Sequence, residues 1–237
     1  MKKLNFQDLI ISETDDYIII NKPPFISTLE DRTNPNNILK LSKSYWDKSQ
    51  VCHRLDKETS GVMAIAKNPK AYSHLSVQFE KRTVKKTYEA VVDGLHNFKN
   101  DRIDAPITAM TNGVVKIDNR YGKKATTVLT TTEAFRRHTL VECQPETGRM
   151  HQIRIHLALV NAPIVGDKQY GGRHLYLSSL KPKFNLKKDT EELPLIKRVA
   201  LHAKTLEFKD LSGHKVSFSA PYPKDFAVLL KQLKAYI

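Results

Sequence analysis

A polar segment of nine residues runs directly into an apolar stretch, and this junction constrains the chain most. Residues 53–61 read HRLDKETSG and residues 62–66 read VMAIA. A short apolar run that follows a turn is typical of a buried strand. We therefore expect His53, Arg54 and Asp56, a base, a guanidinium and a carboxylate, at the rim of a sheet, where folds often present reactive groups.

The same segment has a simpler interpretation. Asp56 followed by Thr-Ser-Gly can form an Asx-type turn, in which the carboxylate only accepts hydrogen bonds from backbone N–H groups. For an isolated segment of this kind, the structural interpretation is the better one.

A second polar segment changes that balance. Residues 148–158 read GRMHQIRIHLA. Ile153, Leu157 and Val160 recur at positions i, i+4 and i+7 and predict a helix with one apolar stripe. His151 and Arg154 are three residues apart and would share a face near the helix start. Taken alone, His151 could be a capping or core residue, and Arg154 could lie on a solvated surface.

Together, the two segments resemble the RluA-type family of RNA pseudouridine synthases. The first has the pattern His-Arg-Leu-Asp-x-x-Thr-Ser-Gly, and the second has Gly-Arg-x-His-Gln-Ile-Arg-x-His-Leu-Ala. Two long patterns in the right order are far more specific than one short motif. Shorter matches extend over most of the chain, at residues 21–23 (NKP), 86–90 (KTYEA), 163–167 (PIVGD), 201–203 (LHA) and 220–223 (APYP).

The resemblance implies isomerisation of uridine to pseudouridine in tRNA or ribosomal RNA, with no cofactor. The reaction needs no redox change, and the sequence lacks nucleotide-binding and metal-ligand motifs. Asp56 matches the family's catalytic aspartate, and both covalent addition to ribose and a glycal route stay open. Arg154 matches the arginine that pairs with this aspartate and would hold its pKa down. A structural Asp–Arg bridge is the alternative, and the two roles are compatible.

Other positions would bind the RNA. Flipping a base out of its stack costs a few kcal/mol, and the extruded base needs support. Arg54 matches a residue associated with the flipped nucleotide. Tyr88 matches a tyrosine that packs on the target base and whose hydroxyl could assist loss of the C5 proton; core packing is its alternative. His53 either orients the loop or touches RNA. The remaining substrate-binding positions are Lys86, Arg149 and His151.

The charge balance independently indicates a polyanionic partner. Lys and Arg number 39 against 25 Asp and Glu, which gives a net charge of +14. Basic side chains on phosphates release counterions and so favour RNA binding. Two basic stretches stand out, at residues 81–86 and 173–198. The first either binds phosphate or is a solvated face; the second is either a flexible RNA-facing loop or a solvated excursion.

Cysteine usage and hydropathy favour a cytoplasmic protein. No long apolar run spans a bilayer, and the N-terminal stretch does not resemble a signal peptide. Cys52 and Cys143 are too few for a disulfide framework. Cys52 precedes His53 and could be a thiol nucleophile, but a half-buried strand residue is the better interpretation. We expect a monomer with no obligatory protein partner and no membrane association.

The expected fold is α+β: one catalytic domain over residues 1–237, with a long mixed, mainly antiparallel sheet flanked by helices and loops and a central basic cleft. The pattern begins so early that we expect no N-terminal S4-type domain. Residues 34–37 predict a turn, after which we expect a helix over 38–45. Asn68 and Pro69, a cap and first-residue pair, predict a helix over 69–81, and an apolar face predicts one over 224–237. We expect hairpins over 125–144 and 201–220 and a loop or small hairpin over 98–122.

One departure from the family concerns the loop after the NKP match. Residues 25–30 read FISTLE, where many members have a glycine and then a Val-His pair. A specific target uridine is therefore not transferred from the resemblance.

Two other function classes stay open. The chain could be a noncatalytic RNA-binding module on the same fold, although such a module has no use for a carboxylate facing phosphate. It could also be a hydrolase with an aspartate nucleophile, although no motif supplies a paired second acid or a metal site.

Overall fold

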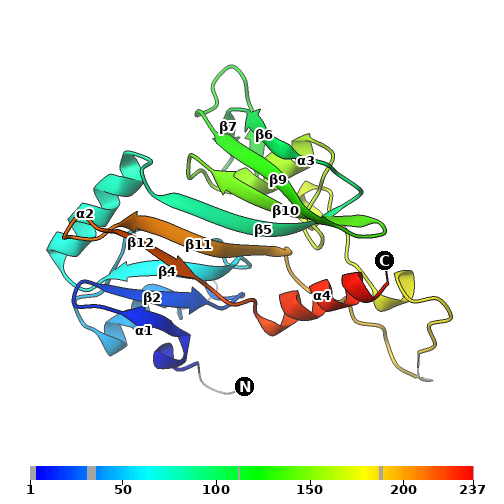
Figure 1. Ribbon diagram of the computed structural model, residues 1–237, viewed down its shortest axis with the longest axis horizontal. Coiled ribbons are helices and arrows are strands. Elements are labelled where there is room, and N and C mark those ends of the chain that lie inside the picture. Colours follow the sequence, from blue (N-terminus) through cyan, green and yellow to red (C-terminus); the bar gives the residue numbers. More distant parts are fainter. Residues whose placement is uncertain (1–3, 31–35, 112, 187–188, 237) are drawn as a thin grey trace. The chain divides into compact units, whose positions relative to one another are not determined.

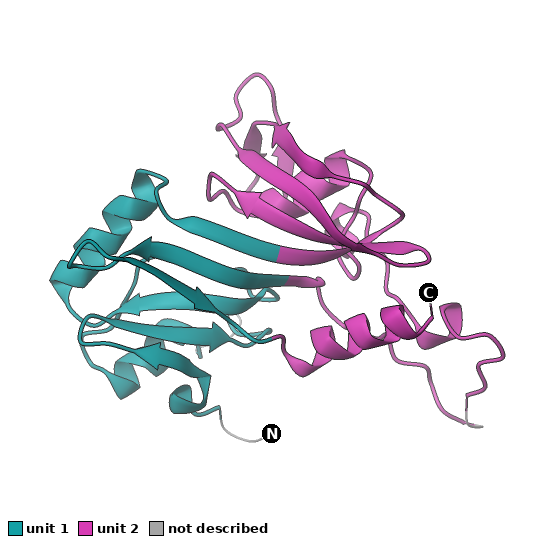
Figure 2. Cartoon of the chain, in the orientation of Figure 1, with its two compact units in different colours: residues 1–88, 202–221 teal, residues 89–201, 222–237 magenta. Residues whose placement is uncertain are grey.

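The computed structural model describes residues 4–30, 36–111, 113–186 and 189–236, and the chain divides into two compact units. Figure 2 colours the first unit, residues 1–88 and 202–221, apart from the second, residues 89–201 and 222–237. Strands β5 (Lys85–Asp93) and β11 (Leu201–Lys209) contribute residues to both units. The expected single catalytic domain over residues 1–237 stays a prediction.

The first unit is built on a mixed sheet with the strand order β1-β2-β4-β11 (Figure 1). The β1–β2 and β2–β4 pairs are antiparallel, and β4 pairs with β11 in parallel. The short β3 adds to β4, and β12 adds to β11, both antiparallel. The bounds of these strands are β1 Ile10–Glu13, β2 Tyr17–Lys22, β3 Gln50–Val51, β4 Ser60–Ala66 and β12 Lys215–Ser219.

Strand β4 confirms the predicted buried strand. All seven of its residues are buried, and β2 pairs with it from Lys22 opposite Gly61 to Tyr17 opposite Ala66. Apolar side chains on both faces remove the strand from water, which is the main stabilising term for such an element. The polar segment of residues 53–59 therefore leads into the centre of a packed sheet.

The two helices of the first unit are α1 (Ile38–Tyr45) and α2 (Pro69–Glu80), within one residue of their predicted bounds. Each begins at an Asn whose side chain accepts a hydrogen bond from a backbone N–H, Asn37 from Lys40 and Asn68 from Ala71. Such caps satisfy an N–H group that the helix itself leaves unpaired. The predicted turn at 34–37 lies partly outside the described residues. A short 3-10 helix, η1 (Phe6–Leu9), precedes β1.

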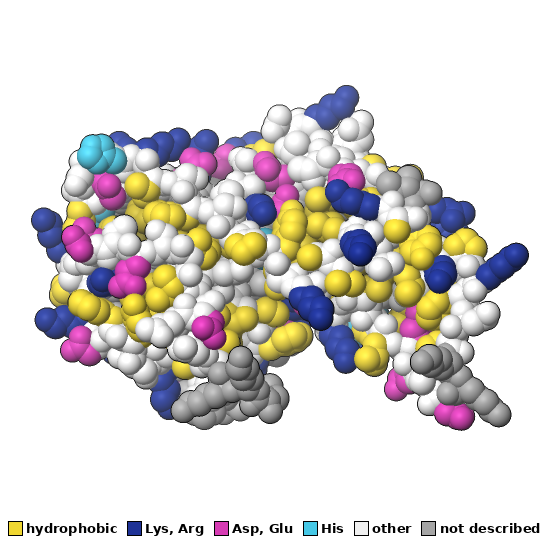
Figure 3. All heavy atoms as spheres, turned by 60° about the horizontal axis from the view of Figure 1, so that its bottom comes forward, with side chains coloured by type: hydrophobic (Ala, Val, Ile, Leu, Met, Phe, Trp, Pro, Cys, Tyr) yellow, Lys and Arg dark blue, Asp and Glu magenta, His cyan; other side chains and the backbone are white. Residues whose placement is uncertain are grey.

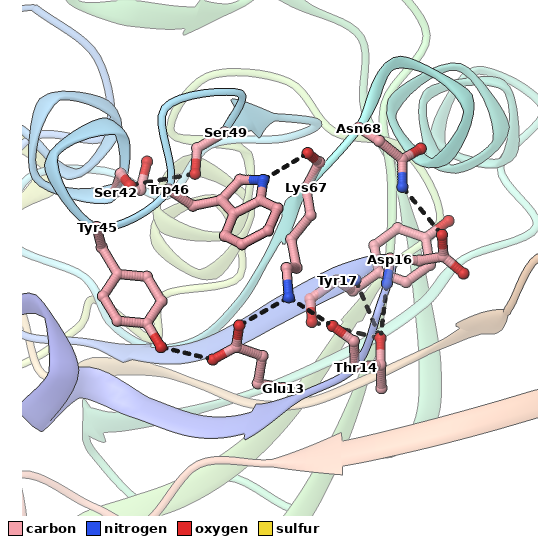
Figure 4. A network of polar contacts seen from close by, with 10 residues as sticks. All are labelled: Glu13, Thr14, Asp16, Tyr17, Ser42, Tyr45, Trp46, Ser49, Lys67 and Asn68. Carbon is pink, nitrogen blue, oxygen red and sulfur yellow. Dashed lines mark hydrogen bonds and ion pairs between the residues drawn. The ribbon is translucent and has the colours of Figure 1, made fainter.

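A polar network holds the end of β4 to β1 and to the end of α1 (Figure 4). The Lys67 ammonium donates to Glu13 Oε1 at 2.8 Å and to the Thr14 carbonyl at 3.0 Å, and lies 4.4 Å from the centre of the Trp46 ring. Trp46 Nε1 donates to the Lys67 carbonyl at 2.8 Å, and the Tyr45 hydroxyl donates to Glu13 Oε2 at 2.9 Å. The network fixes three segments that are distant in sequence.

The second unit contains the strand order β5-β10-β9-β6. The antiparallel β9–β10 hairpin confirms the predicted hairpin over 125–144. Within residues 98–122 the predicted small hairpin is also present, as β7 and β8, but β6 pairs with β9 and was not expected. The bounds are β6 Lys99–Asp104, β7 Ile107–Ala109, β8 Val115–Ile117, β9 Thr126–Ala134 and β10 His138–Pro145.

Helices α3 (Gln152–Leu159) and α4 (Lys224–Ala235) belong to the second unit. As predicted, α4 buries one apolar face, and the fully buried Arg198 fixes its first turn by donating from Nε and Nη2 to Asp225 at 2.7 and 3.0 Å. Two 3-10 helices, η2 (Lys168–Tyr170) and η3 (Leu177–Ser179), complete the unit. In the described part of residues 173–198, η3 is the only helix or strand.

The α+β class and the mixed, mainly antiparallel sheet are therefore confirmed. On the face seen in Figure 3, the Lys and Arg side chains of the described residues are scattered among hydrophobic and acidic ones. Among the described residues, no helix combines the length and the apolar character that crossing a bilayer requires.

Candidate active site

The first unit contributes the loop that carries Asp56. The loop turns tightly after Asp56, whose carbonyl accepts a hydrogen bond from the Thr59 N–H at 3.1 Å. The preceding residue, Leu55, is buried, and the Thr28 hydroxyl binds both of its backbone groups. Thr28 Oγ1 donates to the Leu55 carbonyl at 2.9 Å and accepts from the Leu55 N–H at 3.1 Å. The backbone on each side of the Asp56 carboxylate is therefore held in place.

Lys22 provides a second anchor for this loop. Its ammonium is fully buried and donates to the carbonyls of Pro23 at 3.0 Å, Ile26 at 2.9 Å and Lys57 at 3.3 Å. A buried ammonium needs such acceptors because burial removes its water. Lys22 therefore connects the loop that follows β2 to the residue that follows Asp56.

At the Thr-Ser-Gly end of the loop, the packing of the sheet explains the choice of Ser60 and Gly61. Gly61 has φ of +123°, and a Cβ at this position would lie 2.1 Å from the Ala203 carbonyl oxygen. His202 Nε2 lies 3.2 Å from the Ala220 carbonyl and must donate to it, and the Ser60 hydroxyl oxygen lies 2.9 Å from His202 Nδ1. Residues 60 and 61 thus serve the pairing of β4 with β11.

His53 is held by backbone and ring contacts. Its Nε2 accepts a hydrogen bond from the Ala64 N–H at 3.1 Å, and its ring stacks on Phe79 with centroids 4.6 Å apart. Burial, and to a lesser extent the charge of Lys86, lower the pKa of His53 to about 3. A neutral ring that completes the hydrogen bonding of β4 favours the loop-orienting interpretation of His53.

Tyr88 and Lys86 lie on β5, and both have altered acidity. Burial, followed by the negative charge of Asp56, raises the pKa of the Tyr88 hydroxyl above its ordinary value. Tyr88 is half-buried and packs against the hydrophobic core of the first unit, so packing and substrate contact are both open to it. Burial and the neighbouring Arg82 lower the pKa of Lys86 to about 8. Arg54 is exposed.

In the second unit, the buried amide of Gln152 organises the segment GRMHQIR. Gln152 Oε1 accepts hydrogen bonds from the Thr147 hydroxyl at 2.6 Å and the Arg149 N–H at 3.1 Å. Gln152 Nε2 donates to the Thr126 carbonyl at 2.8 Å and to Thr127 Oγ1 at 3.0 Å. These four bonds join the turn before α3 to strand β9, and sequence reasoning did not assign this role.

His156 continues the network into the core. It is fully buried, and its Nε2 lies 3.0 Å from the Ala105 carbonyl, to which it must donate. Its Nδ1 therefore accepts from the Thr127 hydroxyl at 2.9 Å. Burial lowers the pKa of His156, so a neutral ring is favoured. The histidine of the His-Leu-Ala match is structural.

His151 and Arg149 lie at the start of α3. His151 has φ of +53° and ψ of +18°, a left-handed conformation that is uncommon for a residue other than glycine. Its Nδ1 lies 2.9 Å from the Tyr170 hydroxyl oxygen, and that oxygen accepts a hydrogen bond from the Val115 N–H at 2.9 Å. Arg149 is half-buried, and its Nε donates to the Lys124 carbonyl at 3.4 Å.

Arg154 is buried rather than solvated. Its Nε and Nη2 donate to the two oxygens of Asp167, each at 2.7 Å, and Nη2 also donates to Gln169 Oε1 at 3.0 Å. The guanidinium lies 4.9 Å from the centre of the Tyr170 ring. Asp167 belongs to the PIVGD match, but nothing in its sequence position identified it as the partner of Arg154. The expected pair of Arg154 with Asp56 joins residues of two units and stays a prediction.

The site residues predicted from the sequence thus fall into two groups. The first unit holds five of them and the second holds three. Burial raises the pKa of the Cys52 thiol to about 12, which favours its packing role over a nucleophilic one, although it follows β3 rather than lying within a strand. Among the described residues, no group of three or more His, Cys, Asp or Glu side chains is arranged to hold a metal ion.

Comparison with known proteins identifies the family. A family model described as RNA pseudouridylate synthase matches residues 16–159, which is more than half of the chain. The chain belongs to this family. Relatives named ribosomal large subunit pseudouridine synthase D assign this RNA pseudouridine synthase to the RluA type, as the two motifs predicted.

Two such relatives illustrate the degree of similarity. The one from Xanthomonas campestris pv. campestris is 38% identical over 235 residues, which cover 95% of this chain and 69% of the relative. The one from Escherichia coli strain K12 is 34% identical over 238 residues, which cover 95% of this chain and 70% of the relative.

Solved structures of the same class also resemble this pseudouridine synthase. Human RNA pseudouridylate synthase domain containing 4 aligns with a TM-score of 0.76 and 26% identity, over 97% of this chain and 95% of that one. Human RNA pseudouridylate synthase domain containing 1 aligns with a TM-score of 0.70 and 25% identity, over 94% and 87%. The α+β fold is therefore that of a pseudouridine synthase domain.

Proposed function

We propose that this pseudouridine synthase modifies uridine in large-subunit ribosomal RNA and that Asp56 is its catalytic aspartate. The names of the relatives support the substrate. The surroundings of Asp56 support its catalytic role. Thr28 and Lys22 hold its loop in place, and its negative charge contributes to the raised pKa of the Tyr88 hydroxyl. A carboxylate on a preorganised backbone beside an aromatic ring suits attack on a bound nucleotide.

Tyr88 would support the uracil during the reaction. Its ring offers a stacking surface for the extruded base. Because burial and Asp56 raise its pKa, Tyr88 enters the reaction with its hydroxyl proton in place. It therefore donates a hydrogen bond to the substrate more readily than it removes the C5 proton as a phenolate base.

Arg154 would stabilise the ionised form of Asp56. A guanidinium has five N–H donors, so the observed bonds to Asp167 are compatible with a second carboxylate partner. The fork of Arg154 would be oriented by Asp167, and the Arg154–Asp56 attraction would keep the Asp56 pKa low beside the RNA phosphates. The remaining contacts expected with RNA involve Arg54, Lys86, Arg149 and His151, in a basic cleft.

The experiment measures tritium release from RNA labelled at uracil C5. Large-subunit RNA, small-subunit RNA and tRNA come from cells that lack this protein. We expect wild type to release tritium from the large-subunit RNA and Asp56→Asn to reduce the rate at least about a thousandfold. Asp47→Asn, an exposed acid-to-amide change in the same unit, is the matched control and should match wild type.

The alternatives give different results. Binding of RNA without tritium release by folded wild type would favour the noncatalytic RNA-binding module. Free uracil among the products would indicate a hydrolase. Release from tRNA instead of large-subunit RNA would keep the enzyme but replace the proposed substrate.

An RNA substrate and reduced cysteines also lead us to propose a cytoplasmic location.

A further inference from the structure

Phe25 combines two unusual features. It exposes 52% of its surface, and its φ of +66° lies in the left-handed region. That region favours glycine because a Cβ there meets the backbone, and for a bulky residue it costs on the order of 1 kcal/mol or more. A strained backbone position that places an aromatic ring in solvent calls for an explanation by function.

The backbone around Phe25 is firmly held. Lys22 Nζ binds the carbonyls of Pro23 and Ile26, which flank Phe25, at 3.0 and 2.9 Å. The carbonyl of Ser27 then accepts from the Ile38 N–H at 2.9 Å. The ring is therefore presented by a fixed loop, so little conformational entropy is lost when it binds a partner.

The anchors of this loop are also the anchors of the Asp56 loop. The Lys22 ammonium that binds on both sides of Phe25 also binds the Lys57 carbonyl at 3.3 Å. Three residues after Phe25, the Thr28 hydroxyl holds both backbone groups of Leu55. Lys22 thus joins the Phe25 loop to the Asp56 loop directly, and Thr28 joins the chain just after Phe25 to Leu55, all within one unit.

We propose that Phe25 stacks on a nucleobase next to the target uridine and so contributes to the affinity for the RNA substrate. The proposal rests on the proposed function, because it requires RNA at Asp56. An exposed aromatic ring offers a π-face to any base, and base stacking is sequence-tolerant and sensitive to the geometry of the strand. The alternative occupant, an apolar protein partner, would need the bulk of the side chain but not its aromatic character.

Three substitutions separate these possibilities. Phe25→Gly removes the ring and relieves the left-handed strain, Phe25→Leu keeps apolar bulk, and Phe25→Tyr keeps the stacking surface. The affinity for unmodified large-subunit RNA is measured in the Asp56→Asn background, and KM and kcat are measured with Asp56 intact. Thermal unfolding of each variant gives its stability.

We expect Phe25→Gly and Phe25→Leu to raise Kd and KM by about five- to a hundredfold, the range of one lost base stack, with kcat nearly unchanged. Phe25→Tyr should stay within about twofold of wild type. Phe25→Gly should unfold at the same or a higher temperature than wild type, because glycine tolerates the φ of this position.

Other results overturn the proposal. Wild-type Kd and KM in Phe25→Gly would exclude stacking. Weaker RNA binding by Phe25→Gly but not by Phe25→Leu would indicate that the side chain acts through its apolar bulk alone. A lower unfolding temperature of Phe25→Gly than of wild type would indicate a packing role. Failure of the proposed function is recognised separately, because wild type itself would then release no tritium from the large-subunit RNA.

Discussion

At the scale of single residues, the hydrogen bond from Ala64 to His53 decides what that imidazole can do. A backbone N–H only donates, so Nε2 of His53 must be unprotonated and the ring carries its proton on Nδ1. Protonation would break this bond and place a second positive charge near Lys86. His53 is therefore a poor proton carrier at neutral pH, although it lies in the segment that supplies Asp56.

The lowered pKa of His53 predicts a loss of stability in acid. The unfolded chain takes up the proton near pH 6.5, whereas the folded chain takes it up only near pH 3. The stability that depends on a neutral His53 is therefore fully present above pH 6.5, and it is lost as the pH falls toward 3. Between pH 7.5 and 5, wild type should lose about 1–2 kcal/mol more unfolding free energy than His53→Gln.

Urea unfolding at the two pH values measures this difference. His214→Gln is the control, because the His214 side chain is 81% exposed. An equal loss of stability in wild type, His53→Gln and His214→Gln would contradict the assigned protonation state.

Lys86 leads to a second prediction at this scale. Its pKa of about 8 means that the free protein loses this charge between pH 7 and 9. If Lys86 binds phosphate, RNA affinity should fall several-fold over this range, because the charge must be restored on binding. Lys86→Arg should largely remove this pH dependence, since guanidinium stays protonated.

Filter binding at pH 7, 8 and 9 tests the role of Lys86. The neighbouring, exposed Lys85 supplies the matched control Lys85→Arg, which should behave as wild type. An affinity that is flat from pH 7 to 9 in wild type would exclude Lys86 from the RNA contacts.

At the scale of elements, the sequence predicts those helices and strands that have local signals and misses those that depend on tertiary contacts. Helix α2 was predicted nearly to the residue because its cap, Asn68, and its first residue, Pro69, are local features, and α1 was expected because a turn directly precedes it. Strand β6 was missed because its side chains, KNDRID, are mostly exposed and lack apolar alternation. Its existence depends on pairing with β9, which is not encoded within the segment itself.

The candidate site shows the same division. The two motifs predict roles for Asp56 and Arg154, but the residues that hold Arg154 and the backbone next to Asp56 are distant in sequence or chemically ordinary. Thr28 lies 27 residues from Leu55, and Asp167 lies 13 residues from Arg154. No periodicity or propensity marks such residues, because their function arises only when the chain has folded.

The pairing of β4 with β11 leads to a prediction about Gly61. Gly61→Ala places a methyl group against the Ala203 backbone and should lower the unfolding free energy by about 3 kcal/mol or more. Gly213→Ala is the control, since Gly213 also has a positive φ, of +84°, but open space around it, and it should cost only about 1 kcal/mol. Equal losses in urea unfolding would show that φ alone, rather than close packing, requires glycine at position 61.

At the scale of the whole molecule, net charge gives a prediction that needs no single contact. With a charge of +14, RNA binding should release counterions and weaken steeply with salt. About four phosphate contacts on single-stranded RNA would reduce affinity roughly fiftyfold between 50 and 200 mM salt. The measurement is the slope of log Kd against log salt for Asp56→Asn, with urea unfolding at both salt concentrations as the control for stability. A slope near zero would show that the excess charge does not contact RNA.

The amide of Gln152 has a consequence for how the sequence can drift. The codons for glutamine and glutamate differ at one base, so Gln152→Glu is among the changes that arise most readily. It preserves the volume and shape of the side chain, yet it turns two hydrogen-bond donors into acceptors facing Thr126 and Thr127. The turn that carries Arg149 and His151, together with the start of α3 that carries Arg154, is therefore vulnerable to a substitution that leaves packing unchanged, and selection on this segment must act on chemistry rather than on size.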